Sequence, residues 1–354
     1  MNPAIFDRPS GAGALLGPGD IATPTAGYSL RYLSINYFGQ PVIRVRKDVV
    51  GNPEQDFTPN QLTDGTLATF LGANDGFVSK WYDQFGSNDA EQTSASSQPK
   101  IWDASTGLVT ENGKPALDFD GNDDVLKIPD FAYNVAGGKL TIFATSLCEA
   151  STGSNQYLFA HYDSGTNNRS WAVIYNDSNR FLGSYSRNGS SSDLQTMEFN
   201  GFSFNTQYLT YYIFDTSLSA DNRIKGSYNG VDFTLNNRGG SESSIYNSAG
   251  DLSIGSALTN GSPVVEFRGL VQEIIFYDSD QSANRTKIED NINVYYVLYG
   301  LKHYRQRVLA DSGTFALEGR DALVYNSVTI PEMPSLICSC DAYKATKLYN
   351  INPA

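Results

Sequence analysis

The sequence predicts a mainly β protein, built as a two-sheet sandwich that a C-terminal helix closes. Two observations carry this prediction. The 354 residues include 32 Gly, 22 Tyr and 19 Phe, a composition that favours turns and strands over helices. Runs of β-branched and aromatic residues, each of strand length, alternate with loops rich in Asn, Ser and Gly, as is typical of sandwiches.

The strand signal is clearest in five runs, which are rich in β-branched and aromatic side chains. They cover residues 139–147, 157–161, 171–175, 207–214 and 264–277. A hairpin is predicted where Asn229-Gly230 separates the runs 223–228 and 231–235. Asn-Gly supplies the positive φ angles of a type I′ turn, whose twist matches that of the flanking strands.

Two helices are predicted among the strands. The first covers 66–71, with apolar residues spaced i, i+3 and i+4. The second covers 282–299, carries one apolar stripe and is followed by Gly300 at the position of a C-terminal cap. We expect this second helix to pack on the edge of the sandwich and to close the domain.

The chain divides into three segments by composition. Residues 1–27 are rich in Gly and Pro and are interpreted as an extended N-terminal arm. The sandwich occupies 28–300. Residues 301–354 carry a small hairpin signal at 309–319 and then an extended tail with Pro331 and Pro334. Arms of this kind at both ends would suit grip between subunits.

The composition argues against several functions. Lys+Arg is 25 and Asp+Glu is 38, so the net charge is −13, and we expect no nucleic-acid binding through a basic surface. No apolar run approaches the roughly 18 to 20 residues that span a bilayer, so we expect no membrane insertion. Two histidines argue against a metal site built from several His, and no cofactor is expected. The absence of a secretory signal and the odd number of cysteines predict synthesis in a reducing cytoplasm.

Several segments within the predicted sandwich resemble known domains when taken together. They are 28–31 with 42–47, 81–90 with Gln98-Pro99, and 113–121. The set resembles the catalytic domain of the α-L-arabinofuranosidase B family (glycoside hydrolase family 54), and more closely the concanavalin-like domains of phage structural proteins. Residues 288–296 are similar to the closing helix of laminin-G-like domains, and 309–324 look like a hairpin that recurs in phage proteins. The resemblance implies a concanavalin-like jelly roll over 28–300.

The same resemblance implies cleavage of arabinofuranosides by two carboxylates, a nucleophile and a proton donor about 5 to 5.5 Å apart in a retaining enzyme. The position of the family nucleophile holds Ala172, and that of the family acid holds Ala257. Alanine can neither attack nor donate a proton. Asp177 and Glu266 lie near enough in the sequence to be replacements.

Three further groups of residues could bind a ligand. Trp171, Tyr175 and Tyr185 could form a platform on which a sugar stacks, or they could be core residues of their strands. Trp81 and Asp83 could line a groove, but we favour core packing for Trp81 and a turn cap for Asp83. The third group offers closely spaced oxygen ligands of the kind that Ca²⁺ prefers, or a hairpin turn; it comprises Asp118, Asp120 and Asp123.

These observations favour a non-enzymatic structural protein of a bacteriophage virion. It would be a capsid decoration or cement protein, or a tail-surface protein, and its lectin-like domain would bind host or environmental glycans. Its partners would be other virion proteins and further copies of itself, for example in a trimer, since virion positions are symmetric. The alternative is an arabinofuranosidase-like glycoside hydrolase that uses other carboxylates.

Overall fold

The computed structural model describes residues 17–129, 131, 138–248 and 250–299, together with four short strands between 307 and 351. The chain forms two units, Met1–Ile292 and Asn293–Ala354. The first unit is a β-sandwich, so the predicted fold class is confirmed. Among the described residues, no helix has both the length and the apolar character needed to cross a membrane.

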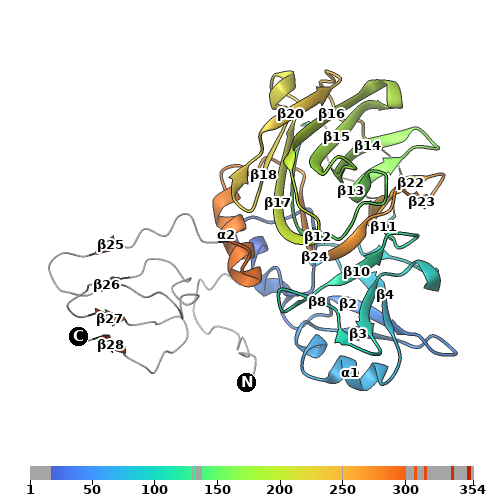
Figure 1. Cartoon of the computed structure of the whole chain (residues 1–354), viewed down its shortest axis with the longest axis vertical. Coiled ribbons are helices and arrows are strands. Elements are labelled where there is room, and N and C mark those ends of the chain that lie inside the picture. Colours follow the sequence, from blue (N-terminus) through green and yellow to red (C-terminus); the bar gives the residue numbers. More distant parts are fainter. Residues whose placement is uncertain are drawn as a thin grey trace. The chain divides into compact units, whose positions relative to one another are not determined.

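One sheet of the sandwich is organised around β24 (Arg268–Tyr277), which pairs antiparallel along both of its edges (Figure 1). On one edge lie β1 (Ala26–Ser29) and β10 (Leu117–Asp120). On the other edge follow, in order, β12 (Lys139–Cys148), β17 (Thr206–Asp215), β18 (Ile224–Tyr228) and β19 (Val231–Asp232). Strands from the two ends of the first unit therefore share one sheet.

The second sheet is also antiparallel and carries the site described below. Its order is β5 (Ala90–Glu91), β11 (Leu126–Ile128), β21 (Leu252–Ile254), β13 (Gln156–Asp163), β14 (Asn168–Tyr175), β15 (Arg180–Gly189), β16 (Leu194–Gly201) and β20 (Leu235–Gly239). The hairpin of β22 (Ala257–Thr259) and β23 (Ser262–Val264) adjoins the end of β13.

The remaining elements precede β10 in the chain or connect the longer strands. The strands are β2 (Ile43–Lys47), β3 (Glu54–Phe57), β4 (Gly76–Trp81), β6 (Lys100–Asp103), β7 (Gly107–Leu108), β8 (Thr110–Glu111) and β9 (Lys114–Pro115). The helices are α1 (Thr66–Leu71) and the 3-10 turns Pro18–Asp20, Ile35–Tyr37, Asn60–Leu62, Ala95–Ser97, Ser191–Asp193 and Ala220–Asn222. The predicted helix at 66–71 is confirmed.

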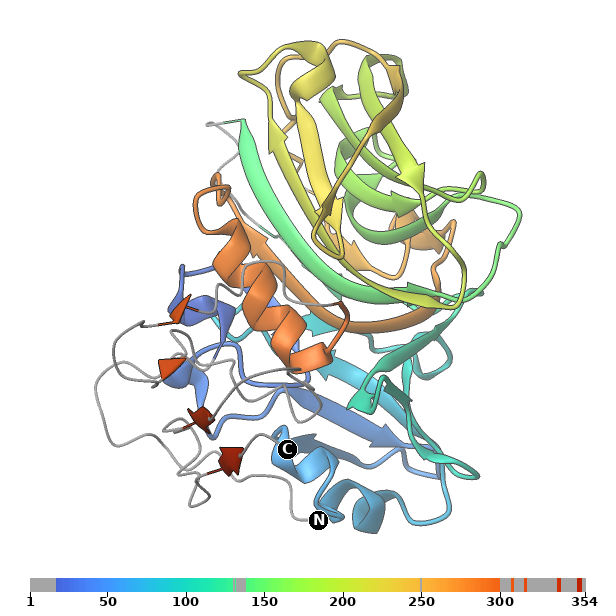
Figure 2. The ribbon, with the colours of Figure 1, turned by 60° about the vertical axis from the view of Figure 1, so that its left-hand side comes forward.

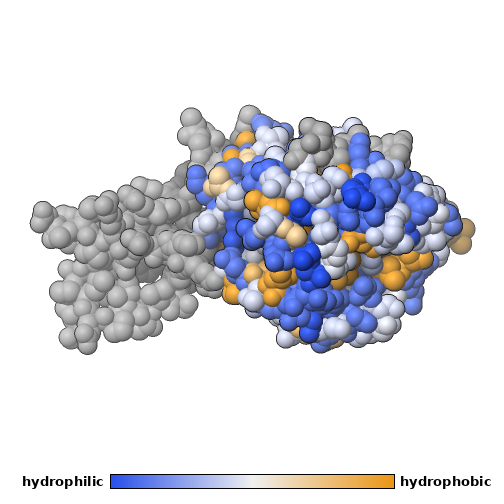
Figure 3. Space-filling model, turned by 90° about the horizontal axis from the view of Figure 1, so that it is seen from above, coloured by the Kyte–Doolittle hydropathy of each residue, from blue (hydrophilic) through white to orange (hydrophobic). Residues whose placement is uncertain are grey.

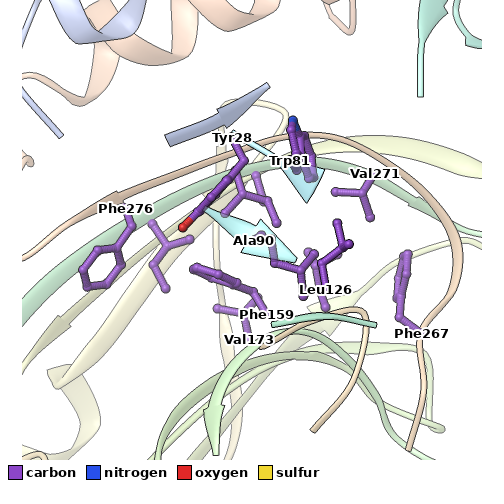
Figure 4. Packing of buried hydrophobic residues seen from close by; sticks show 14 of the residues in the cluster. Tyr28, Trp81, Ala90, Leu126, Phe159, Val173, Phe267, Val271 and Phe276 are labelled. Carbon is purple, nitrogen blue, oxygen red and sulfur yellow. The ribbon is translucent and has the colours of Figure 1, made fainter. Parts of the chain in front are cut away.

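Aromatic side chains fill the space between the two sheets. Trp171 of β14 stacks on Phe276 of β24, with ring centroids 5.4 Å apart and planes 7° from parallel. Phe159 of β13 meets Trp171 edge-on. Figure 4 shows Phe159 and Val173 of the second sheet facing the same cluster as Phe276 and Tyr28 of the first. Burying one such aromatic side chain contributes roughly 2 to 3 kcal/mol, so this interior fixes how the sheets pack.

The predicted closing helix is α2 (Arg285–Tyr296). Figure 2 shows it beside β24, and Ile288 and Ile292 are buried. Polar contacts connect it to the first sheet: Arg31, after β1, forms a buried ion pair of 2.7 Å with Glu273 of β24 and donates to Asn291 Oδ1 at 3.0 Å. The start of the first unit and its last helix are thereby joined through β24.

The outer surface seen in Figure 3 is mostly hydrophilic, with small separate apolar areas.

The structure corrects three expectations about the chain's segments. Residues 17–27 do not form an extended arm, because the Gly19 amide donates to Leu33 at 2.9 Å and β1 begins, fully buried, at Ala26. The predicted strand 264–277 is two strands, broken at Val265, whose φ is 52°. Of the predicted hairpin after Asn229-Gly230, only Val231–Asp232 pairs with β18; β20 pairs with β16 instead.

The C-terminal segment contains two short antiparallel pairs. β25 (Arg307–Val308) pairs with β26 (Phe315–Ala316), near the hairpin predicted at 309–319. β27 (Leu336–Cys338) pairs with β28 (Tyr349–Ile351), where an extended tail was predicted. The rest of 301–354 and the predicted arm residues 1–16 lie outside the described residues.

Candidate functional site

A β-bulge in β13 turns one tyrosine out of the core. Tyr157 pairs with Ile174 and Phe159 pairs with Val173, so Leu158 is an extra residue in β13. Leu158 and Phe159 both belong to the core cluster between the sheets. Because a bulge reverses the alternation of side chains, Tyr157 points to the outer face of the second sheet.

A second bulge, in β14, turns an arginine to the same face. His161 pairs with Trp171 and Tyr162 pairs with Arg169, which leaves Ser170 as the extra residue. Strict alternation would place Arg169 on the face of Trp171, inside the sandwich. With Ser170 inserted, Arg169 instead lies beside Tyr162 on the outer face.

Small side chains lie beneath these residues. Ala160 and Ala172 pair across β13 and β14, and both are fully buried. They cluster with Ile174 and Leu182, and Tyr157 and Tyr162 pack against that cluster. The same cross-strand row continues through neutral residues on both sides, namely Ser253, Ser184 and Thr196. We call Tyr157, Tyr162 and Arg169, with Ala160 and Ala172 beneath them, the outer patch.

The two tyrosines of the outer patch form a tilted pair. Their ring centroids are 5.5 Å apart, with 51° between the planes, and both side chains are half-buried. Burial, with Tyr162 beside it, raises the pKa of Tyr157 above its ordinary value, so this phenol stays neutral. Flat rings with polar hydroxyl groups suit ligands that are themselves part apolar and part polar.

Neutral acceptors hold Arg169 in place. Its Nε donates to the Tyr162 hydroxyl at 3.1 Å, and its Nη1 donates to Asn167 Oδ1 at 3.0 Å and to the Gly189 carbonyl at 3.2 Å. The guanidinium carbon lies 5.6 Å from the centre of the Tyr162 ring. None of these partners is charged.

The predicted aromatic platform is wrong, because its three members lie on the inner face. Trp171 and Tyr185 are fully buried and Tyr175 is 1% exposed. The Tyr175 hydroxyl bonds to the Ser146 hydroxyl at 3.0 Å, and Tyr185 donates to the Glu242 carbonyl at 2.5 Å. These side chains therefore build the core and cannot present a ring face to a sugar.

Trp81 and Asp83 do not line a groove either. Trp81 is fully buried in the core and Asp83 is 2% exposed. The Asp83 carboxylate accepts the backbone amides of Gly27 and Phe85, both at 3.0 Å. Burial raises the pKa of Asp83, and these bonds oppose that shift. The favoured interpretation as a core residue and a turn cap agrees with these contacts.

The two alanine positions of the resemblance lie in strands that both adjoin β13, Ala172 in β14 and Ala257 at the start of β22. Ala172 belongs to the floor of the outer patch. The Ser253 hydroxyl donates to the Ala160 carbonyl at 3.1 Å and to the Ser256 carbonyl at 2.6 Å. Ser253 therefore links Ser256, the residue before Ala257, to β13, the strand that pairs with β14 at Ala172.

The two replacement carboxylates lie beyond this floor. Asp177 is exposed in the turn after β14, five residues beyond Ala172 and about 16 Å away at the rise of a strand. Glu266 follows Val265, whose carbonyl accepts the Tyr157 amide at 3.2 Å, so it lies at the Tyr157 end of β13. Neither residue shares the cross-strand row of Ala172.

The predicted Ca²⁺ ligands are only partly brought together. Among the described residues, Asp120, Asp123 and Asp124 place carboxylate oxygens within 4.8 Å of one another, and Asp118 is outside this group. Asp120 accepts both the backbone and side-chain nitrogens of Asn122, and Asp124 accepts the Asp120 amide at 2.9 Å. These bonds are those of a hairpin turn. Burial raises the pKa of Asp118 to about 6 and that of Asp124 to about 7.

No protein-family model and no curated protein matches the chain. Solved structures match its fold. A family 54 α-L-arabinofuranosidase soaked with a cyclic sulfate inhibitor has a TM-score of 0.51 at 13% identity, over 83% of this chain and 68% of that chain. A Trypanosoma rangeli sialidase mutant displaying trans-sialidase activity has a TM-score of 0.42 at 13% identity, over 63% of this chain and 32% of that chain. A Ruminococcus gnavus sialidase module bound to α2,3-sialyllactose has a TM-score of 0.34 at 12% identity, over 42% and 80% of the two chains.

The arabinofuranosidase match confirms the fold to which the sequence was expected to be similar. It also contradicts the prediction of a non-enzymatic protein, because the architecture in question is that of a glycoside hydrolase. Ala172 and Ala257 therefore cannot be used to exclude hydrolysis. At 13% identity the match shows the fold alone.

Proposed function

We propose that this chain is a carbohydrate-binding β-sandwich protein whose binding surface is the outer patch. The observation that carries the proposal is the outward-facing pair Tyr157 and Tyr162 over the Ala160 and Ala172 floor, where a bulge in β13 turns Tyr157 outward beside Tyr162 and a bulge in β14 adds Arg169. Bulges that re-aim side chains are over-represented next to functional sites.

The patch has the two properties that sugar binding requires. The half-buried rings offer flat apolar area together with hydroxyl groups, which suits the CH face and the hydroxyl groups of a pyranose or furanose. The rings are fixed by packing on the alanine floor, so little ordering cost remains to be met on binding. A sugar would thus bind a surface that is already formed.

Glycan-array screening followed by calorimetry on the full chain tests the proposal. Tyr157→Ala and Tyr162→Ala should each weaken binding by about fivefold, since a stacked aromatic contributes on the order of 1 kcal/mol. The matched control is Tyr32→Ala: Tyr32 forms a similar tilted, half-buried pair with Phe38, at 5.1 Å and 48°. Equal loss in the control, or no binding to any sugar on the array, would contradict the proposal.

A second candidate is hydrolysis of glycosides, which the fold shared with an arabinofuranosidase favours. Release of a chromogenic arabinofuranoside by the full chain would support it. Loss of release in Glu266→Gln would assign a role to the carboxylate at the Tyr157 end of β13, and loss in Asp177→Asn would assign it to the turn after β14. Sugar binding without release from the arabinofuranoside would support the binding role and contradict hydrolysis.

The setting we propose is the surface of a phage particle, where the chain would assemble with other virion proteins and with copies of itself. The support is the resemblance of 81–90 and 113–121 to phage structural domains. Mass spectrometry of purified particles should detect the chain, and light scattering should give a mass several times the 38.7 kDa of one copy. A monomer absent from particles would contradict this setting.

A further inference from the structure

We propose that the outer patch selects sugars that carry a carboxylate, with Arg169 as the specificity-determining residue. This inference rests on the proposed function, because it names the class of sugar that the same patch binds.

Arg169 differs from most arginines that the structure describes, because none of the described carboxylates lies within 4.0 Å of its guanidinium nitrogens. Arg44, Arg180 and Arg238, for example, pair with Asp56, Glu198 and Asp221 at 2.7, 3.1 and 2.5 Å. The chain has 38 acidic residues and only 25 Lys and Arg. An arginine without a carboxylate partner in so acidic a chain therefore stands out.

Asp163, the acidic residue next to Tyr162, already accepts hydrogen bonds from other groups. Asp163 accepts the backbone amides of Gly165 at 3.0 Å and of Asn260 and Gly261, both at 2.9 Å. Its two oxygens thus fix the turn after β22. The charge of Arg169 is left for a group from outside the chain.

The hydrogen bonds of Arg169 also fix which donors remain. A guanidinium has five N–H groups. The Nε–H and both Nη1–H groups are occupied by Tyr162, Asn167 and Gly189, so both Nη2–H groups are left for a ligand. Because the guanidinium plane is already held, a carboxylate can bind it with little further loss of side-chain freedom.

The position of Arg169 fits a substituent on a stacked ring. Its guanidinium carbon is 5.6 Å from the centre of the Tyr162 ring, so it lies close to any substituent of a sugar that rests on this ring. A sugar resting on Tyr157 and Tyr162 would therefore place a uronic or sialic carboxylate within reach of Nη2. A neutral sugar would keep the stacking and lose the charge-assisted hydrogen bonds.

The test uses the intact chain and ligands that differ only in charge. Calorimetry compares trigalacturonate with its methyl ester, and 3′-sialyllactose with its methyl ester. The unmodified chain should prefer the acid of at least one pair by about 10- to 100-fold. Raising the NaCl concentration from 50 to 500 mM should lower the affinity for that acid, whereas the affinity for its neutral partner should change little.

Variants separate charge selection from sugar binding. Arg169→Gln should keep the affinity for the neutral partner and abolish the preference, and Arg169→Lys should retain part of it. Arg223→Gln is the matched control: Arg223 also lacks a carboxylate partner, but its bonds are to the backbone carbonyls of Leu218, Ser241 and Glu242, so the preference should be unchanged. Equal affinity for acid and neutral partner in the unmodified chain, with binding still lost in Tyr162→Ala, would overturn the inference and leave the proposed function standing. No binding of any sugar would overturn both.

Discussion

The two faces of the β13–β14 pair differ in the side chains that they carry and in how those side chains are placed. The inner face carries Trp171 and Phe159 on strict alternation, packed against the first sheet at core density. The outer face carries Ala160 and Ala172, with Tyr162 in regular alternation with Ala160, and bulges bring Tyr157 and Arg169 to the same face. The comparison shows that regular alternation builds the scaffold in this sheet, whereas the bulges add Tyr157 and Arg169 to the groups available to a ligand.

The largest expected difference between the faces is in stability. Trp171→Ala should lower the free energy of unfolding by about 3 to 5 kcal/mol, because it removes a fully buried side chain and leaves a cavity. Tyr162→Ala, on the outer face, should cost about 1 kcal/mol because the ring is only half-buried. Urea denaturation with unchanged m-values measures both, and equal costs would remove the distinction between the faces.

Filling the floor of the outer patch should lower stability less than Trp171→Ala does, and it should weaken sugar binding more. Ala172→Leu adds three carbons beneath Tyr157 and Tyr162 and should cost about 1 to 3 kcal/mol through overpacking. Because the displaced rings no longer lie together, sugar affinity should fall in parallel with Tyr162→Ala. Unchanged affinity in a folded Ala172→Leu variant would show that the binding surface lies elsewhere.

The inner face should also respond to pH through His161. Burial lowers the pKa of His161 to about 4 from its ordinary 6.5, although its Nε2 bonds the Gly250 carbonyl at 2.7 Å. The unfolded chain therefore takes up the proton first as pH falls below about 6.5, and stability present above that pH is progressively lost towards pH 4. At pH 5.5 the loss should be on the order of 1 kcal/mol. Thermal unfolding of His161→Gln should lose this part of the pH dependence; an identical profile in both proteins would contradict it.

The smallest effect concerns a single oxygen atom. Tyr162→Phe keeps the ring and removes the hydroxyl that accepts from Arg169 Nε at 3.1 Å. Stability should change by no more than about 0.5 kcal/mol, because the bond is half-exposed, and binding of neutral sugars should persist. The preference for acidic sugars should fall severalfold as the guanidinium loses one of its supports, and calorimetry with the acid and ester pair would detect this.

Much of the fold follows from local signals in the sequence. The strand predicted at 139–147 is β12, Lys139–Cys148, and the Asn229-Gly230 turn has the predicted positive φ angles of 45° and 68°. The Gly and Pro residues of 17–27 do not mark an extended arm, because there glycine allows close approach of the backbone: a Cβ on Gly17 would lie 2.4 Å from the Leu33 carbonyl oxygen. Composition could not distinguish a tight packed turn from a free arm.

The outer patch could not have been predicted in the same way. On strict alternation, Arg169 shares the face of Trp171, and Tyr157 shares that of Phe159, so the aromatic residues chosen from the sequence were those of the core. Only the pairing partners reveal that Leu158 and Ser170 are extra residues, and those partners depend on the tertiary arrangement. A sequence signal did exist in the adjacent pair Leu158-Phe159, two large apolar residues in a row where alternation allows one.

The strands that pair with β24 determine when the first sheet can form during synthesis of the chain. Ala26 near the start of the first unit pairs with Phe276, and β12 uses the opposite edge of the same strand. Nearly the whole unit must therefore be synthesised before β1 and β12 can pair with β24, and until then each has an edge with unpaired backbone groups. Such distant pairing predicts slow folding and a need for protection of nascent chains, so yield on expression should depend on chaperone supply more than on the strength of the finished core.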